Sequence, residues 1–382
     1  MDRRFPEVIK LHKYLVARHW DGRALIGPDP GIRFNYRIGR FMKSYLRRVK
    51  WNDDYYYLQA QGYWVLGNWR LFTRTGEEKY REIAVRCSEY MLERQRGDGA
   101  WDYPNPEWKG RVATAEGTWG ALGLLESSRQ TADTKFLGGA LSWHRFLTET
   151  IGYQKVGSEL SVNYFAHRDT SRVPNNSAFV LRFLAELADL TGDQTYLEPA
   201  AGLLTFLRNA QKPTGEFPYA VEGPRGGPRR PHFQCYQYNA FQGLDLMKYY
   251  EKRGDESIFP LVRGVLSFLS TGLGEDGHAF YDCHSRKRAV TYHTAVLGAP
   301  FRVAGQLGLD GDDHLASRAY HYVLGLQRPD GGFPHSRGEY QVLSDQRSYP
   351  RYLAMILYHL LIGDPATEGT VPRRDTAHAV VR

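Results

Sequence analysis

The sequence WNDDYYYLQAQGYWVLGNWRLFTRTGEEKYREIAVRCSEYMLERQRGDGAW, residues 51–101, decides the fold of this chain. Apolar residues recur in it at three- and four-residue steps, first from Tyr55 to Phe72 and again from Glu78 to Arg94. This is the period of an amphipathic helix, and two such runs joined by a short loop predict a helical hairpin. A hairpin of this length cannot bury both of its faces alone, so it has to stack against neighbouring hairpins.

The same unit recurs along the rest of the chain. Further hairpins are predicted to begin near Thr114, Pro174, Cys235 and Tyr292, and a single first helix near Tyr349. Five hairpins and one unpaired helix leave one partner missing, and the helical pattern over residues 4–17 can supply it. Six hairpins then close into a ring, which buries the two faces that an open solenoid would expose. We therefore expect an all-α fold, an (α/α)6 toroid.

Composition and length suit one large soluble domain. With 382 residues, 42% hydrophobic and 24% charged, the chain can bury a sizeable core. We expect a single toroid domain over residues 1–363 and a polar, disordered tail over residues 364–382. The net charge of +8 is modest and accompanies no nucleic-acid-binding motif, so no specific nucleic-acid partner is expected. Nothing in the sequence indicates an oligomeric state.

The sequence also predicts a cytoplasmic location. Three cysteines are too few for a disulfide framework and fit a reducing compartment. The N-terminus lacks the apolar core of a signal peptide, and no apolar run approaches the length of a membrane span.

The ends of the hairpins resemble the QW motif of the terpenoid cyclase and protein prenyltransferase toroids. That motif has an aromatic residue, a glutamine five positions on, a glycine four further and an aromatic residue two beyond. Three sets match it: Tyr90, Gln95, Gly99 and Trp101; Phe206, Gln211, Gly215 and Phe217; Tyr322, Gln327, Gly331 and Phe333. In those families the motif ties outer helices together, so the resemblance implies the fold rather than a chemistry.

The opening Trp51-Asn52-Asp53-Asp54 resembles a second group, the six-hairpin glycosidases. In that group a Trp-x-Asp-Asp sequence at the entry to an inner helix contributes a catalytic aspartate, as in unsaturated glucuronyl hydrolases. The resemblance implies an enzyme that acts on carbohydrate as a hydrolase, lyase or epimerase, with Asp53 or Asp54 in its catalytic site.

In a toroid of hairpins, the first helix of each hairpin lines the inside, and its N-terminus meets the preceding loop at one mouth of the ring. General acid–base chemistry there needs two groups with separated pKa values. The candidate catalytic residues are Asp53, Asp54, Glu116, Asp282 and His293. The candidate substrate-binding residues are Tyr56, Trp101, Tyr103, Asn175, Asn176, Tyr219, Tyr236, Gln237, Asn239, Tyr281, Arg347, Tyr349 and Arg351, and the loops add His284 and His335. Several of these types are also ordinary helix caps.

Two other functions remain open from the sequence. An isoprenoid-processing enzyme, similar to a terpene cyclase or prenyltransferase, would need a deep, mainly apolar cavity with one buried acid. Asp310-Gly311-Asp312-Asp313 spells the DxDD signature of class II terpene cyclases, but its register places it in a loop between two helices. A non-catalytic toroid that binds a glycan or peptide would show no acid with a strongly perturbed pKa.

No phosphate-cradling glycine-rich loop appears, and we expect no cofactor or metal. Zinc is the alternative. Cys235 and the His293 segment resemble in position the zinc ligands of prenyltransferase β-subunits, and Cys235 with the later pair Cys283-His284 resembles the zinc site of lanthipeptide cyclases. Cysteine and histidine ligands with one open position would suit a catalytic zinc ion.

Overall fold

The structure is a computed structural model that describes residues 4–32, 38–46, 49–108, 110–167, 171–227, 229–309, 311–364 and 366. Six helices form an inner ring: α3 (Leu58–Thr75), α5 (Thr114–Thr131), α7 (Pro174–Thr191), α9 (Cys235–Arg253), α11 (Thr291–Gln306) and α13 (Pro350–Leu361). Six more surround them: α4 (Glu78–Glu93), α6 (Thr134–Phe146), α8 (Ala200–Ala210), α10 (Phe259–Ser270), α12 (Asp313–Gly325) and α1 (Phe5–Arg18).

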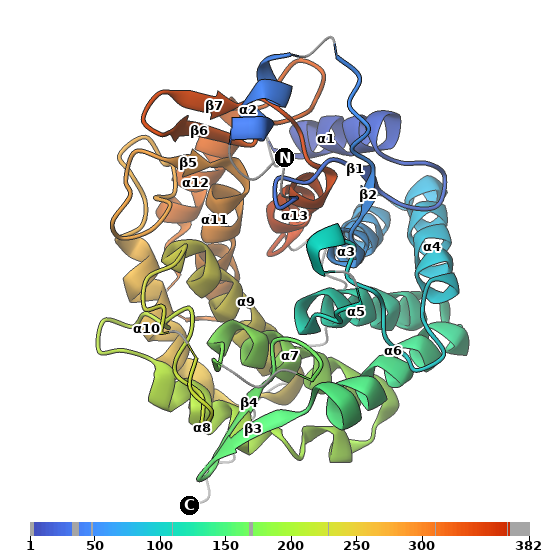
Figure 1. Cartoon of the computed structure of the whole chain (residues 1–382), viewed down its shortest axis with the longest axis vertical. Helices are drawn as coiled ribbons and strands as arrows, with labels where there is room; N and C mark the ends of the chain where they lie inside the picture. Colours follow the sequence, from blue (N-terminus) through green and yellow to red (C-terminus); the bar gives the residue numbers. More distant parts are fainter. Residues whose placement is uncertain are drawn as a thin grey trace, which may run out of the picture.

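Each inner helix packs against the next one, and the last, α13, packs against the first, α3 (Figure 1). The ring is therefore closed. α1 packs against α13 and completes the sixth hairpin, as the helix count predicts. The (α/α)6 toroid expected from the sequence is confirmed.

The glutamines of the three QW-like sets act as ties between outer helices. Each side-chain amide donates one hydrogen bond within its own turn and one to a carbonyl of the next outer helix. Gln95 reaches Gly99 and Gly139, Gln211 reaches Gly215 and Leu261, and Gln327 reaches Gly331 and Glu7, all at 2.8–3.0 Å. The tie from Gln327 joins α12 to α1 and so spans the seam of the ring.

The glycine of each set is required for close backbone approach. Gly331 has a left-handed backbone (φ 92°), and a Cβ placed on it would lie 2.4 Å from the carbonyl oxygen of Lys10 in α1. Gly99 and Gly215 have the same conformation and the same kind of contact with α6 and α10. A side chain would both strain this conformation and push the neighbouring helix away.

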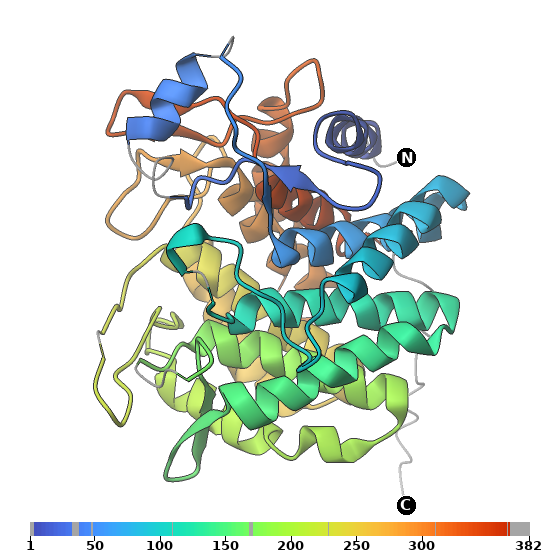
Figure 2. The ribbon, with the colours of Figure 1, turned by 45° about the vertical axis from the view of Figure 1, so that its right-hand side comes forward.

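Loops, short helices and small antiparallel sheets gather at one end of the inner helices (Figure 2). The sheets are β1 (Ile26–Gly27) with β2 (Tyr55–Tyr56), β3 (Tyr153–Val156) with β4 (Glu159–Val162), and β5 (Ala289–Val290) with β6 (Ser336–Glu339) and β7 (Leu343–Asp345). α2 (Ile38–Tyr45) packs on β7. Short helical turns lie at Pro106–Trp108, Leu147–Ile151, Gln194–Leu197 and Glu256–Ile258.

Most of the predicted tail lies outside the described residues. Asp364, at its start, is buried and pairs with Arg74 of α3, so the described chain stays packed on the ring to this point. Asp310 of the DxDD sequence is also outside the described residues. Asp312 caps α12 by accepting hydrogen bonds from the backbone of His314 and Leu315, in the loop between helices where the register places it. Within the described residues no helix is long and apolar enough to cross a membrane.

Candidate active site at the mouth of the ring

Two adjacent cavities lie at the mouth of the ring, and we call them the outer and the inner cavity. The outer cavity has a volume of about 960 Å³ and is lined by the loops around α9, α11 and β6. The inner cavity, about 280 Å³, lies among the inner helices. Phe233, Gln234, Tyr292 and Tyr352 line both, so the two are adjacent. Their sizes suit a small-molecule ligand.

Glu116, in the first turn of α5, lines the inner cavity. Its carboxylate lies against the first turn of α3, where the backbone N–H of Gln59 donates to Oε2 at 2.8 Å. The side chain is only 4% exposed, and burial raises the pKa of Glu116 to about 7, although the charge of Arg351 acts to lower it. Near neutral pH this carboxyl can therefore either give or take a proton, as a general acid or base must.

Asp245 brings a second carboxyl to the inner cavity from the middle of α9. Arg182 of α7 donates to it at 3.2 Å but also to Glu186 at 2.7 Å. Burial raises the pKa of Asp245 to about 7. Burial alone would also raise the pKa of Glu186, but the charges of Arg182 and Arg129 lower it to about 2. Because one guanidinium is shared between two carboxylates, it neutralises the negative charge of Asp245 only in part.

Several buried polar atoms of the inner cavity have no hydrogen-bond partner within the described protein. They are Asn175 Oδ1, Asn176 Nδ2, Gln237 Oε1 and Asp245 Oδ2. Buried polar atoms are nearly always paired in folded proteins, so a group of unpaired ones around a cavity indicates that a ligand or water completes them. Amide and carboxyl groups match the donors and acceptors of hydroxyl groups.

Arg351, the second residue of α13, adds a fixed cation to the inner cavity. It pairs with both oxygens of Asp29 at 2.8 and 2.9 Å, donates to Tyr352 at 2.8 Å and lies over the ring of Tyr57. Burial raises the pKa of Asp29, and the charge of Arg351 opposes that rise. A guanidinium held on several sides in this way keeps one orientation toward the cavity.

Two histidines line the outer cavity together with Tyr292. The ring of His293 contacts that of Tyr292 edge-on with centroids 4.6 Å apart, and the ring of His335 lies parallel to it at 6.4 Å. Burial lowers the pKa of both imidazoles well below the ordinary value, and Arg288 adds to the effect. Both rings are therefore neutral at physiological pH, and His293 Nδ1 is buried without a hydrogen-bond partner among the described residues.

Basic side chains outnumber acidic ones around the outer cavity. Arg40 and Arg288 both pair with the single carboxylate of Glu339, at 2.7 and 2.9 Å. Arg286 and Lys287 also line the cavity and are exposed. The lining therefore carries an excess of positive charge, which attracts anionic ligands.

The backbone around the outer cavity is strained. Among the described non-glycine residues with a left-handed backbone are Gln234, Tyr340 and Gln341, with φ of 46°, 47° and 72°, and all three line this cavity. Such conformations cost on the order of 1–2 kcal/mol each and cluster where function requires them. The Gln234 side chain donates to Tyr281 Oη at 2.7 Å, which helps to hold this segment in place.

The ring brings eleven of the twenty sequence-predicted site residues together. Seven line the inner cavity: Glu116, Tyr103, Asn175, Asn176, Tyr219, Gln237 and Arg351. Four line the outer one: Tyr281, His284, His293 and His335. The other predicted residues lie outside both linings: Asp53, Asp54, Asp282, Tyr56, Trp101, Tyr236, Asn239, Arg347 and Tyr349.

Asp53 belongs to a buried ion-pair cluster. Lys43 of α2 and Arg347 contact its carboxylate at 2.9 and 2.7 Å. Burial acts to raise the pKa of Asp53, but the hydrogen bonds and charges of these two cations lower it below the ordinary value. Asp54 is exposed. α3 begins at Leu58 rather than near residue 55, because Tyr55 and Tyr56 pair with β1, so Asp53 lies well before the helix.

Most of the other predicted residues outside the linings have visible packing contacts. Trp101 donates from its indole to Met91, Tyr236 stacks on Phe268, and Tyr349 donates to Asp345. Asn239 binds both the N–H and the C=O of Phe217, at 2.7 and 3.0 Å. Tyr56 contacts Tyr90 and Arg94, Asp282 forms the turn before His284, and Arg347 pairs with Asp53.

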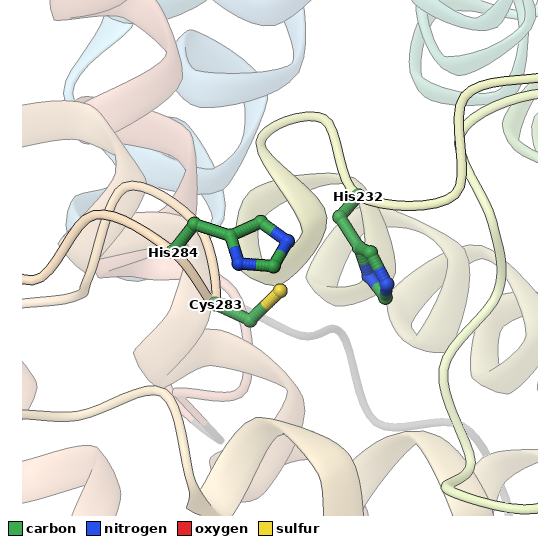
Figure 3. Close-up of side chains that lie close together, drawn as sticks. All are labelled: His232, Cys283 and His284. Atoms are coloured by element: carbon green, nitrogen blue, oxygen red, sulfur yellow. The ribbon is translucent and has the colours of Figure 1, made fainter.

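Four residues are candidates for the zinc alternative. Two of them, Cys283 and His284, lie together with His232, which the sequence did not indicate. The ligand atoms of His232, Cys283 and His284 all lie within 4.8 Å of one another (Figure 3). Cys235 and His293 are not part of this group. Cys235 lies next to it, because its sulfur accepts a hydrogen bond from the backbone of Cys283 at 3.3 Å.

Sequence reasoning missed His232, Asp245 and Arg288. A signal existed for Asp245, because an acid between Leu244 and Leu246 interrupts the apolar centre of an inner helix. No periodic pattern marks His232 and Arg288, which lie in loops and approach the cavity only through tertiary packing.

Comparison of the sequence with models of known protein families gives no match, and neither does comparison with curated proteins. The fold, however, is that of the six-hairpin glycosidase-like α/α toroids. A cellobiose 2-epimerase from Bacillus thermoamylovorans matches with a TM-score of 0.71 and 11% identity, over 94% of this chain and 99% of that one.

Two glycosidase structures match over the same share of this chain. A possible member of the GH105 family from Salmonella enterica has a TM-score of 0.66 and 15% identity, over 94% of this chain and 93% of that one. A family 76 glycoside hydrolase from Bacteroides thetaiotaomicron has a TM-score of 0.65 and 14% identity, over 94% and 77%. At such identities the likeness establishes the fold.

Proposed function

We propose that this chain is a carbohydrate-active enzyme that binds a sugar in the inner cavity, with Glu116 as its general acid–base group. One observation carries the proposal: a buried carboxyl with a pKa of about 7 faces a cavity walled by tyrosine rings and by three amide groups. Each of these amides has one buried polar atom with no partner in the described part of the chain. Sugar rings stack on aromatic faces, and sugar hydroxyls need such donors and acceptors. The similar structures, an epimerase and glycoside hydrolases, support the same class.

Glycoside hydrolysis is the first reaction that this arrangement suits. The departing glycosidic oxygen needs a proton, which Glu116 carries in its protonated form. A second carboxyl, in its ionised form, then activates water or attacks the sugar. Asp245 is the other carboxyl of the inner cavity, and because its pKa is also about 7, the active form is the one in which Asp245 is ionised while Glu116 is protonated. Arg351 and the amide groups of Asn175 and Asn176 would position the sugar between them.

The two neutral histidines favour epimerisation as a second candidate. Epimerisation next to a carbonyl removes a proton from one face of a carbon atom and returns a proton to the other. A neutral imidazole can take the first proton and becomes an imidazolium. A water molecule in the cavity can return a proton to the other face of the carbon, and the imidazolium then neutralises the hydroxide that is left. His293 and His335 both line the outer cavity, and both rings lie near the ring of Tyr292.

The charge of the outer cavity supports an acidic sugar as substrate. Arg286 and Lys287 are exposed at its rim, and Glu339 is shared between Arg40 and Arg288. A carboxylate or sulfate on the sugar would meet this excess of positive charge. The polar lining opposes the isoprenoid alternative, which needs a mainly apolar cavity. We also propose a cytoplasmic location, supported by three cysteines that are all free thiols.

The experiment incubates the purified chain in D2O with a panel of neutral and acidic oligosaccharides and free sugars. Release of new reducing ends reports hydrolysis, and deuterium incorporation at a single carbon reports epimerisation. We expect Glu116→Gln to abolish the first activity and His293→Asn the second. Glycan binding without turnover of any sugar would instead support the non-catalytic alternative. Turnover unchanged in both variants would refute the assignment of these residues.

A further inference from the structure

Three side chains of types that commonly bind metal ions lie together at the rim of the outer cavity. They are separate from Glu116 and from the pair His293 and His335. His232 belongs to the loop before α9, and Cys283 and His284 belong to the loop before β5 (Figure 3). Their ligand atoms all lie within 4.8 Å of one another. In a tetrahedral zinc site, bonds of about 2.0–2.3 Å place neighbouring ligand atoms roughly 3.5 Å apart, so a contraction of about 1 Å would complete it.

His232 is oriented by a buried carboxylate. Its Nδ1 donates to Glu216 Oε1 at 2.9 Å, and Glu216 also accepts from Lys212 at 3.0 Å. The Glu216 side chain is only 3% exposed, so this acceptor is held in place. The hydrogen bond fixes the tautomer and leaves Nε2 as the ring nitrogen with a free lone pair. Metal-binding histidines commonly have such a carboxylate partner on the other nitrogen.

Cys283 and His284 are presented by a tight turn. The N–H of His284 donates to the carboxylate of Asp282 at 2.9 Å, and the N–H of Ser285 donates to the carbonyl of Asp282. The N–H of Cys283 donates to the buried sulfur of Cys235. These bonds anchor the backbone of the turn, so its two side chains project together toward His232.

We propose that His232, Cys283 and His284 bind one Zn²⁺ ion, with Glu216 as the positioning residue. One thiolate and two imidazoles suit a borderline-soft ion such as Zn²⁺ and do not suit Mg²⁺ or Ca²⁺. Three protein ligands leave a fourth position open, as in catalytic rather than structural zinc sites. Cys283 and His284 line the outer cavity, so an oxygen of a ligand bound there can occupy that position. The inference is independent of the proposed sugar chemistry, because metal binding is measured without substrate.

To test this, bound metal is removed from the purified chain with a chelator. The affinity for Zn²⁺ is then measured by titration against a chromophoric competitor. Metal content after dialysis gives the stoichiometry, and Co²⁺ substitution gives a thiolate-to-cobalt absorption band if Cys283 is a ligand. We expect one ion per chain. Cys283→Ser should remove the cobalt band and weaken Zn²⁺ binding at least 100-fold. Glu216→Gln should keep the band and weaken binding about 10–100-fold, as expected for loss of a partner that orients a ligand.

Two control variants keep the test specific. His314→Asn removes an exposed histidine far along the chain, at the start of α12, and should leave affinity unchanged. Cys235→Ser should retain stoichiometric binding and the cobalt band. Less than 0.1 Zn²⁺ per wild-type chain, an unchanged affinity in Cys283→Ser, or loss of the band in Cys235→Ser but not in Cys283→Ser would each overturn the proposal. Any of these results would leave the sugar chemistry at Glu116 standing.

Discussion

Replacing Glu116 with glutamine should remove activity and at the same time change how stability depends on pH. Burial raises the pKa of Glu116 from 4.5 to about 7. Between these values the folded chain holds a proton that the unfolded chain has lost, so this residue makes stability fall as pH rises. The full loss in unfolding free energy is about 3 kcal/mol; little of it is present at pH 5, and almost all of it at pH 8.

Glutamine is close in shape to the protonated glutamic acid and keeps an oxygen that can accept from Gln59. Glu116→Gln should therefore have nearly wild-type stability at pH 5 and exceed the wild type at pH 8 by about 3 kcal/mol. Because Glu116 is the proposed general acid–base group, its replacement should lower kcat by about 10²–10⁴. A variant that is more stable and inactive separates a catalytic role from a folding defect.

The assay is denaturant unfolding of both proteins at pH 5, 6, 7 and 8, with Glu82→Gln on the exposed face of α4 as the control. The difference in unfolding free energy between Glu116→Gln and the wild type should rise by about 2–3 kcal/mol across this range. A difference that stays constant within about 0.5 kcal/mol would mean that Glu116 titrates like an exposed carboxyl. The reasoning from burial would then be refuted, and with it the acid–base role.

Two further predictions concern charge and ring closure. Changing Arg286 and Lys287 to glutamine should lower kcat/KM for an acidic sugar about tenfold at low ionic strength. The kcat/KM for a neutral sugar should stay within about twofold of the wild-type value. Equal losses for both sugars would contradict electrostatic attraction. Gly331→Ala should lower the unfolding free energy by about 2 kcal/mol or more, because the new Cβ meets the Lys10 carbonyl at a left-handed backbone position. Gly138→Ala, at an exposed site of α6 with open space, should instead raise it by about 0.5–1 kcal/mol; a similar loss in both variants would refute the close-approach argument.

The periodic part of the sequence predicts the ring well. Hairpin starts near Thr114, Pro174, Cys235 and Tyr292 are helix starts or lie within one residue of them, because local periodicity decides where an amphipathic helix forms. The start near residue 55 is three residues early. Tyr55 and Tyr56 pair with β1, and such a pairing between distant strands leaves no local signal.

The candidate site is harder to predict, because register does not fix where a side chain points. Glu116 and Asn175 sit at the predicted register and line the inner cavity. Asp53 is predicted for the same mouth, but it lies before the start of its helix, where Lys43 and Arg347 both bind its Oδ2. Those partners come from α2 and from the loop before α13, and only the folded ring brings them to Asp53. The orientation of His232 likewise depends on a tertiary contact, its hydrogen bond to Glu216.

The tie between Gln327 and Glu7 joins positions 320 residues apart and has a consequence for biosynthesis. On the ribosome, α1 emerges before the other helices of the ring and its partner α13 emerges after them, so the seam of the ring stays open until α13 has been made. Until then the faces of α1 and α3 that α13 covers remain exposed to solvent, and a growing chain with such surfaces is prone to associate with others. Contacts this distant along the chain also slow the final closure.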